Sequence, residues 1–272
     1  MAQNTILWKV SDTLHHKTSY LVGTFHQFGN SFVDSIPQIK EALMSSKLAV
    51  FESIEDVEST RNMINQRVSS TDIEKWLKKK DLVALKEVSQ HWEVDLYKLK
   101  PLEISWKLQQ EFQKVKCQTV HPSDDFDHFD SYLIYLAQLH GKEIVGLETD
   151  SLQLDLIAQE YKYPDWKSER KRIRTWVQLL QSEQTDFDYC QLAKKYRKFD
   201  LDYELEKECE ASVLLMQRNN VWMKSLPRLL RSQDTFVAVG LYHLMKQCGI
   251  IEQLRSQGFL VEPLEIVRIG EN

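Results

Sequence analysis

The stretch "YLVGTFHQFG" (Tyr20–Gly29) decides the expected fold, and it has a counterpart near the other end of the chain, "FVAVGLYHLM" (Phe236–Met245). In each stretch an apolar, β-branched run reaches a glycine, and a histidine follows three residues later. Runs of this composition, bounded by polar residues, predict buried β-strands. The same Gly-x-x-His pattern therefore follows two predicted strands that are separated by most of the sequence.

The residues after each of these predicted strands indicate a βαβ unit. In the first unit, Ser35 and Gln38 match a capping box at the start of a helix. In both units we expect parallel strands joined by a right-handed crossover. The first unit consists of "TSYLVGTF" (18–25), "DSIPQIKEALMSS" (34–46) and "KLAVFES" (47–53), and the second of "DTFVAVGLYHL" (234–244), "GIIEQLRSQG" (249–258) and "FLVEPLEIV" (259–267).

The whole chain predicts an α/β (α+β) fold with a central mixed sheet built from two pseudo-repeated βαβ halves. Helical periodicity dominates the sequence between the halves, which indicates a large helical insertion. No low-complexity linker separates these parts, so we expect a single domain over residues 1–272. Its expected parts are a first half at about 5–55, the insertion at about 56–231 with a short strand near 143–148, and a second half at about 232–270.

Composition narrows the class of protein and its environment. The net charge of −5 argues against nucleic acid as a main partner. No apolar run approaches the roughly 18 residues of a membrane helix, and no signal peptide is recognisable at the N-terminus. The cysteines are scattered and form no C-x-x-C pair, which predicts reduced thiols. These features predict a cytoplasmic protein, or an exported one if a signal has been removed; the cysteines are Cys117, Cys190, Cys209 and Cys248.

Polar side chains follow four of the predicted strands. Open α/β sheets bind ligands at the carboxyl ends of their parallel strands. If these strands are neighbours, two imidazoles and one or two carboxylates meet at one edge of the sheet. These residues are His26, Glu52, Glu148 and His243.

Two imidazoles and a carboxylate form a common ligand set for a catalytic divalent metal. We therefore expect a metal site made of His26, Glu52 and His243, with Glu148 as a further ligand or general base. Gly23 and Gly240 lack a Cβ, so a substrate or neighbouring backbone can approach closely before each histidine. A structural role stays open for each histidine alone, and Glu148 also precedes a predicted helix start.

The segment "CQTVHPSDDFDHFD" (Cys117–Asp130) contains cysteine, histidine and aspartate side chains that suggest a second metal site. It lacks the glycine of an EF-hand loop and has no paired C-x-x-C. We instead expect its acidic residues to stabilise a helix N-terminus through the helix dipole.

Ordered segments of the chain resemble the TraB/GumN family, which includes the TraB/PrgY pheromone-shutdown proteins and the animal Tiki proteins. The resemblance covers Leu7 to Pro263 and rests on the whole ordered set, since each Gly-x-x-His motif alone is weak. The matching segments are "LWKV…SYLVGTFHQF", "AVFES", "GKEIVGLETDSLQ", "QRNNVWMKSLPRLL" and "FVAVGLYHL…GIIEQLRSQGFLVEPL".

The resemblance implies a metal-dependent hydrolase, because Tiki relatives act as metal-dependent proteases. It also adds Arg218 and Asn219, the "RN" pair of the family's last long helix. A fixed guanidinium at Arg218 suits a substrate carboxylate or a developing oxyanion, although an ion pair on a solvated helix face stays open. Asn219 is expected to contact substrate. The matched positions are Gly23, His26, Glu52, Glu148, Gln153, Arg218, Asn219, Gly240 and His243.

The function that these features predict is metal-assisted hydrolysis of a peptide bond in a peptide or protein substrate. The expected cofactor is one divalent ion, manganese, cobalt or zinc. The alternative is a non-catalytic protein that sequesters a small peptide, as pheromone shutdown suggests, or a cofactor such as haem.

Overall fold

A computed structural model describes residues 4–55, 57–184 and 186–270 of the chain. The described residues form two compact units. The sheet unit comprises residues 1–54, 119–149 and 191–272, and the helical unit comprises residues 55–118 and 150–190.

The sheet unit contains one six-stranded mixed sheet with strand order β4-β3-β5-β2-β1-β6. Strand β5 lies between β2 and β3 and is parallel to both, and β4 continues the parallel part beyond β3. Strand β1 is antiparallel to β2 and to the edge strand β6. The strands are β1 (Leu7–Asp12), β2 (Lys17–Thr24), β3 (Leu48–Phe51), β4 (Glu143–Gly146), β5 (Thr235–Gly240) and β6 (Leu260–Pro263).

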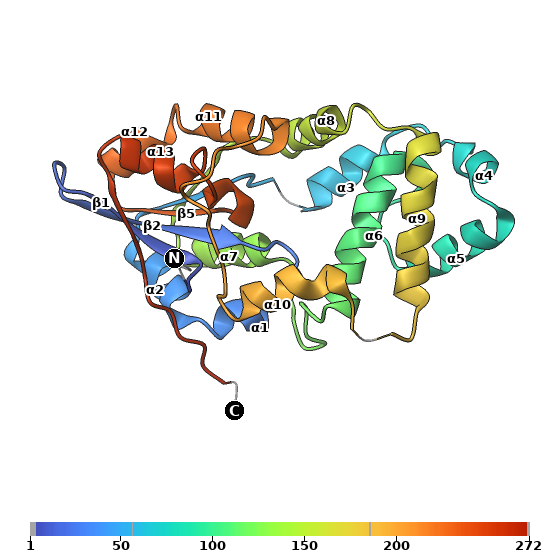
Figure 1. Ribbon diagram of the computed structural model, residues 1–272, viewed down its shortest axis with the longest axis horizontal. Helices are drawn as coiled ribbons and strands as arrows, with labels where there is room; N and C mark the ends of the chain where they lie inside the picture. The colour runs from blue at the N-terminus through green and yellow to red at the C-terminus, as the bar shows by residue number, and fades with distance from the viewer. Residues whose placement is uncertain (1–3, 56, 185, 271–272) are drawn as a thin grey trace. The chain divides into compact units, whose positions relative to one another are not determined.

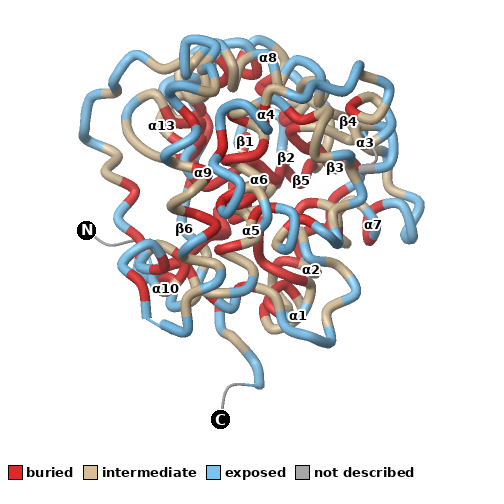
Figure 2. The backbone as a smooth tube through the Cα atoms, turned by 90° about the vertical axis from the view of Figure 1, so that its right-hand side faces the viewer, coloured by how far each residue is buried: buried red, intermediate tan, exposed pale blue. Residues whose placement is uncertain are grey.

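The central strands are buried along their length, which explains why they read as continuous apolar runs. Every residue of β3 and β5 is buried, as the red tube of Figure 2 shows. Parallel strands need cover on both faces, because the crossover helices pack there. Figure 1 shows α11, α12 and α13 on one side of the sheet and α1, α2 and α10 on the other.

The helices of the sheet unit are short, and a π-helix and a 3-10 helix lie among them. They are α1 (Asn30–Asp34), α2 (Pro37–Ser45), α7 (Phe129–Leu139), α10 (Gln191–Arg197), the π-helix Val213–Gln217, α11 (Arg218–Trp222), α12 (Leu226–Ser232), the 3-10 helix Leu241–Leu244 and α13 (Ile250–Ser256).

The helical unit is organised around the pair α6 and α9. Pro101 begins α6, where its missing N–H costs nothing, and the Asp165 side chain caps α9 by accepting from the Ser168 N–H. The Phe112 and Trp176 rings pack between the two helices at 5.3 Å. Its elements are α3 (Val57–Asn65), α4 (Asp72–Trp76), α5 (Lys79–Ser89), α6 (Pro101–Lys116), α8 (Asp150–Glu160), α9 (Trp166–Gln181) and the 3-10 turns Leu96–Lys98 and Asp188–Cys190.

The structure confirms the predicted mixed α/β class, and β5 of the second predicted half lies between β2 and β3 of the first. Of the residues expected as one insertion, 119–149 and 191–231 belong to the sheet unit. The predicted capping box is wrong: α2 begins at Pro37, and the Ser35 hydroxyl donates to Phe32 O at the end of α1. None of the described helices has the length and apolar character to cross a membrane.

The prediction of reduced thiols is also wrong, because the structure pairs every cysteine. Cys117 is bonded to Cys190 within the helical unit, and Cys209 to Cys248 within the sheet unit. Sequence spacing did not reveal these pairs, since 73 and 39 residues separate their partners. The tertiary fold brings them together.

The disulfides lead to a direct test. Protein that is purified without reductant and unfolded in guanidinium should show no thiol that reacts with a chromogenic disulfide reagent. After reduction it should show four, the number of cysteines in the sequence. Peptide mapping of the unreduced protein should recover the two linked pairs. Four reactive thiols before reduction would contradict the pairing.

Candidate functional site

The polar residues predicted at the strand ends do come together in the sheet unit. Since β4, β3, β5 and β2 are neighbours, the residues that follow them share one edge of the sheet. Glu52 directly follows β3, and His243 lies in the 3-10 helix after β5. His243 Nε2 lies 3.7 Å from Glu52 Oε1, and the backbone N–H of Gly240 donates to the same oxygen at 2.7 Å.

A buried arginine holds both carboxylates of the site. Arg218 Nη2 donates to Glu52 at 2.6 Å and to Glu148 at 2.5 Å, and Nε donates to Glu148 at 3.1 Å. Nη1 donates to Leu214 O at 3.2 Å and lies 3.0 Å from His243 Nε2. A guanidinium has five N–H donors, and here all five have partners. Arg218 therefore has no donor left for a substrate carboxylate or an oxyanion while these bonds persist.

A π-helix immediately before Arg218 places its side chain in this position. The π-helix Val213–Gln217 leads directly into α11, and Ser212 caps it by accepting from the Leu215 N–H. A π-helix changes which side chains face inward and recurs at functional sites. Arg218 and Trp222 are buried, and Trp222 Nε1 donates to Glu148 at 3.2 Å. The Trp222 ring also packs on the guanidinium at 4.6 Å.

The charges of this cluster keep both partners ionised. Burial alone would raise the pKa of Glu52, but the positive charges of His26 and Arg218 and the backbone bond from Gly240 help to lower it to about 2. Burial alone would lower the pKa of Arg218, but Glu52 and Glu148 raise it above its usual value. Glu148 is also buried and bonded at both oxygens, so it has no exposed oxygen to serve as the predicted general base.

The positive charge of Arg218 should be essential to the stability of the fold. We expect Arg218→Met to lower the free energy of unfolding by about 3–5 kcal/mol, because it leaves two buried carboxylates without their partner. Adding Glu148→Gln to this variant should recover part of the loss. Urea unfolding measures both, and the exposed Arg228→Met serves as control. Additive losses would contradict the coupling.

His243 is held as a neutral imidazole. Its Nδ1 lies 2.6 Å from Asn219 Oδ1, and Asn219 Nδ2 donates to the carbonyls of His243 and Cys248 at 3.1 and 2.9 Å. These donor bonds fix the amide orientation, so Nδ1 carries the proton and Nε2 carries the lone pair. Burial is the main reason that the pKa of His243 falls to about 3. Asn219 is buried and its amide is fully engaged with protein groups, which favours a positioning role over the predicted contact with substrate.

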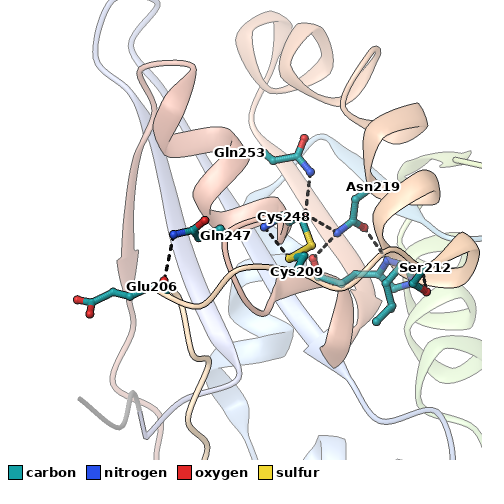
Figure 3. Close-up of a disulfide and its surroundings, with 9 residues drawn as sticks. Glu206, Cys209, Ser212, Asn219, Gln247, Cys248 and Gln253 are labelled. Atoms are coloured by element: carbon teal, nitrogen blue, oxygen red, sulfur yellow. Dashed lines mark hydrogen bonds between the residues drawn. A yellow bond between two sulfur atoms is a disulfide. The ribbon is translucent and has the colours of Figure 1, made fainter.

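The Cys209–Cys248 disulfide supports this arrangement. Figure 3 shows the Cys248 carbonyl accepting from both Asn219 and Gln253 beside the S–S bond. The disulfide connects the irregular segment before the π-helix to the loop that follows His243. It therefore joins the two segments that supply Asn219 and His243.

His26 has the opposite electrostatic setting. Its Nδ1 lies 2.6 Å from Asp130 Oδ2, and the Thr24 hydroxyl donates to the other Asp130 oxygen at 3.0 Å. Burial alone would lower the pKa of His26, but the carboxylates of Asp130 and Glu52 raise it to about 9. The His26 side chain is 37% exposed, whereas that of His243 is 4% exposed. Solvent therefore reaches the site on the side of His26.

In the metal-free protein, these two histidines should make the free energy of unfolding depend on pH in opposite directions. Below pH 6.5 the unfolded chain protonates position 243 while the folded state resists it, so stability should fall from pH 6.5 to 5. The contribution of His26 is complete below pH 6.5 and should be lost as pH rises toward 9. Urea midpoints measured in chelator should show both slopes. His243→Gln should flatten only the acidic one and His26→Gln only the alkaline one, and unchanged slopes in these variants would refute the assignment.

Gly240 keeps a space open between two of the predicted ligands. A Cβ at this position would lie 3.2 Å from His26 Nε2 and 3.2 Å from Glu52 Oε1. Gly23 differs, because a Cβ there would meet Leu244 at 2.9 Å and Leu241 at 3.0 Å. The first glycine of the paired motifs thus permits close packing of the chain, and the second opens the site.

A second group of side chains at this edge includes His128, which the sequence offered as part of a second metal site that we did not expect, and Asp130, which no sequence pattern singled out. His26, His128 and Asp130 offer ligand atoms within 4.8 Å of one another, so they could hold a metal ion. The His128 ring stacks on His26 at 5.3 Å, and its Nδ1 lies 3.8 Å from Asp130. The sequence pattern predicted a helix N-terminus in this stretch. Asp130 does lie in the first turn of α7, and only the fold shows that this turn abuts His26.

The fold and site define an α/β protein with a histidine- and carboxylate-rich centre at the ends of its parallel strands. A family model matches residues 6–263, nearly the whole chain, and is described as the TraB/PrgY/gumN family. The chain belongs to this family. Neither the curated proteins nor the solved structures contain a match.

Proposed function

We propose that this protein is a metal-dependent hydrolase that cleaves peptide bonds, with one divalent ion held by His26, Glu52 and His243. The observation that carries the proposal is the direction of the two imidazoles. Each Nδ1 is 2.6 Å from a side-chain oxygen, of Asp130 or Asn219. The other ring nitrogens lie near Glu52: His243 Nε2 is 3.7 Å from Glu52 Oε1, and His26 Nε2 borders the same space at Gly240 as that oxygen. Such hydrogen bonds to the second ring nitrogen are the usual support of metal-binding histidines.

The residues present carry the ligand types that a small cation uses. The space that Gly240 leaves open lies between His26 Nε2 and Glu52 Oε1, and His243 Nε2 faces the same carboxylate. Glu52 stays ionised because its pKa is about 2. In the structure Arg218 donates to His243 Nε2, so this bond has to open before His243 can act as a ligand. Manganese, cobalt and zinc all accept imidazole and carboxylate together.

The chemistry of the reaction follows from this centre. When bound, a divalent ion lowers the pKa of its water and polarises the carbonyl under attack. Glu52 supplies the negative charge that attracts the ion. Arg218 and Glu148 hold Glu52 in place, and Trp222 covers them. His26, the most exposed of the three ligands, lies where a substrate enters. The choice of a peptide bond rests on the resemblance to Tiki proteins.

The disulfides bear on where this hydrolase works. Paired cysteines persist in oxidising compartments and are rare in the cytosol. Both disulfides therefore favour an oxidising environment over the cytoplasm that the sequence indicated. A peptide or protein of such a compartment is the substrate class that we propose.

Turnover with defined metals tests the function. Purified protein supplied with manganese, cobalt or zinc should cleave members of a mixed peptide library. His26→Ala and His243→Ala should reduce cleavage to the background rate, because each removes one ligand. His140→Ala changes an exposed histidine and should cleave like the parent protein.

The rival function is sequestration without cleavage. The full engagement of Glu148 and Arg218 is the observation that favours it, since neither is available for acid–base work in this state. If the protein binds a peptide or haem stoichiometrically and forms no product with any of the metals, the hydrolase function is rejected and sequestration is supported.

A further inference from the structure

Asp130 connects the candidate centre to helix α7. It lies in the first turn of α7 and is buried. One carboxylate oxygen faces His26 Nδ1 and the other accepts from the Thr24 hydroxyl. The Phe129 N–H donates to the His26 carbonyl at 2.9 Å. Side-chain and backbone bonds therefore hold the start of α7 against the segment that carries His26.

These contacts restrict the carboxylate to one orientation. Thr24 ends β2, and His26 follows two residues later. With Oδ1 held by Thr24, Oδ2 is directed at Nδ1 and requires a proton there. The lone pair of a neutral His26 ring is then on Nε2, the atom next to the space that Gly240 leaves open.

We propose that Asp130 is a positioning residue that fixes the ring orientation and tautomer of His26, so that Nε2 is the metal-binding atom. This inference rests on the proposed metal site. Asn219 does the same for His243 with a neutral amide. The two histidines thus have matched supports, of which one is charged and one is not.

The other possible role of Asp130 is that of a direct ligand, together with His26 and His128. The distances favour positioning. Asp130 Oδ2 lies 2.6 Å from His26 Nδ1, a hydrogen-bond separation. Two ligand atoms bound tetrahedrally at about 2.0–2.1 Å from an ion are about 3.3 Å apart.

Asp130→Asn provides the main test. The Thr24 hydroxyl should keep the amide oxygen, so the amide NH₂ will face Nδ1 and present a donor where an acceptor is needed. We expect the affinity for Co²⁺, measured by calorimetry, to fall about 10–100-fold. Thr24→Val in the same background frees the amide to rotate and should restore part of the affinity. A purely structural role would not produce this rescue.

A second readout does not depend on metal. In the metal-free parent protein, the Nδ1 proton of His26 should give a hydrogen-bonded, downfield resonance in proton NMR of ¹⁵N-histidine-labelled protein, assigned by its loss in His26→Gln. Asp130→Asn should remove it. Unchanged cobalt affinity together with an unchanged resonance would overturn the proposal.

His128 separates the two roles of Asp130. His128→Asn keeps a residue suited to the N-cap of α7. If Asp130 only positions His26, this variant should lose less than tenfold in cobalt affinity. A loss as large as that of Asp130→Asn would instead assign the ion to His26, His128 and Asp130. If the parent protein binds no cobalt at all, the proposed metal site fails, while the Nδ1 resonance still decides whether Asp130 positions the ring.

Discussion

The arrangement of the centre depends on one buried cation between two buried carboxylates. Glu52 and Glu148 follow β3 and β4, which are adjacent strands, so the parallel sheet brings two carboxylates together where little water reaches them. Burying a carboxylate without a partner carries a large free-energy cost. Arg218 compensates both carboxylates with one guanidinium, and all five of its N–H donors have partners. The π-helix before α11 places the Arg218 side chain between the two carboxylates, and the Trp222 ring packs on its guanidinium.

The two Gly-x-x-His segments look alike in sequence and differ in chemistry. His243 is buried beside an amide and a guanidinium, so its imidazole is neutral. His26 is partly exposed beside Asp130, which favours its charged form. The proposed ion would therefore require different changes at the two residues: a proton would have to leave His26, and the contact with Arg218 would have to leave His243. In the structure the charged groups of this network are paired with one another.

The disulfide at Cys248 is part of the same network. The Cys248 carbonyl accepts from Asn219, and Asn219 in turn faces His243. The segment around Cys209 has little regular secondary structure, and the disulfide, together with hydrogen bonds such as Gln247 N–H to Lys207 O at 3.0 Å, joins it to the loop after His243.

The sequence by itself determined the strands and the chemistry that follows them. Buried parallel strands must be apolar throughout, so their ends are visible as the point where polar residues return, and His26, Glu52, Glu148 and His243 were found in this way. Only the tertiary structure decided which groups these residues contact. Arg218 reads as a surface ion pair or a substrate clamp until the fold shows that its partners lie 70 and 166 residues away. Asp130 and the disulfides were hidden for the same reason: side-chain pairing over long sequence distances leaves no local periodicity, since it arises only when separate elements pack together.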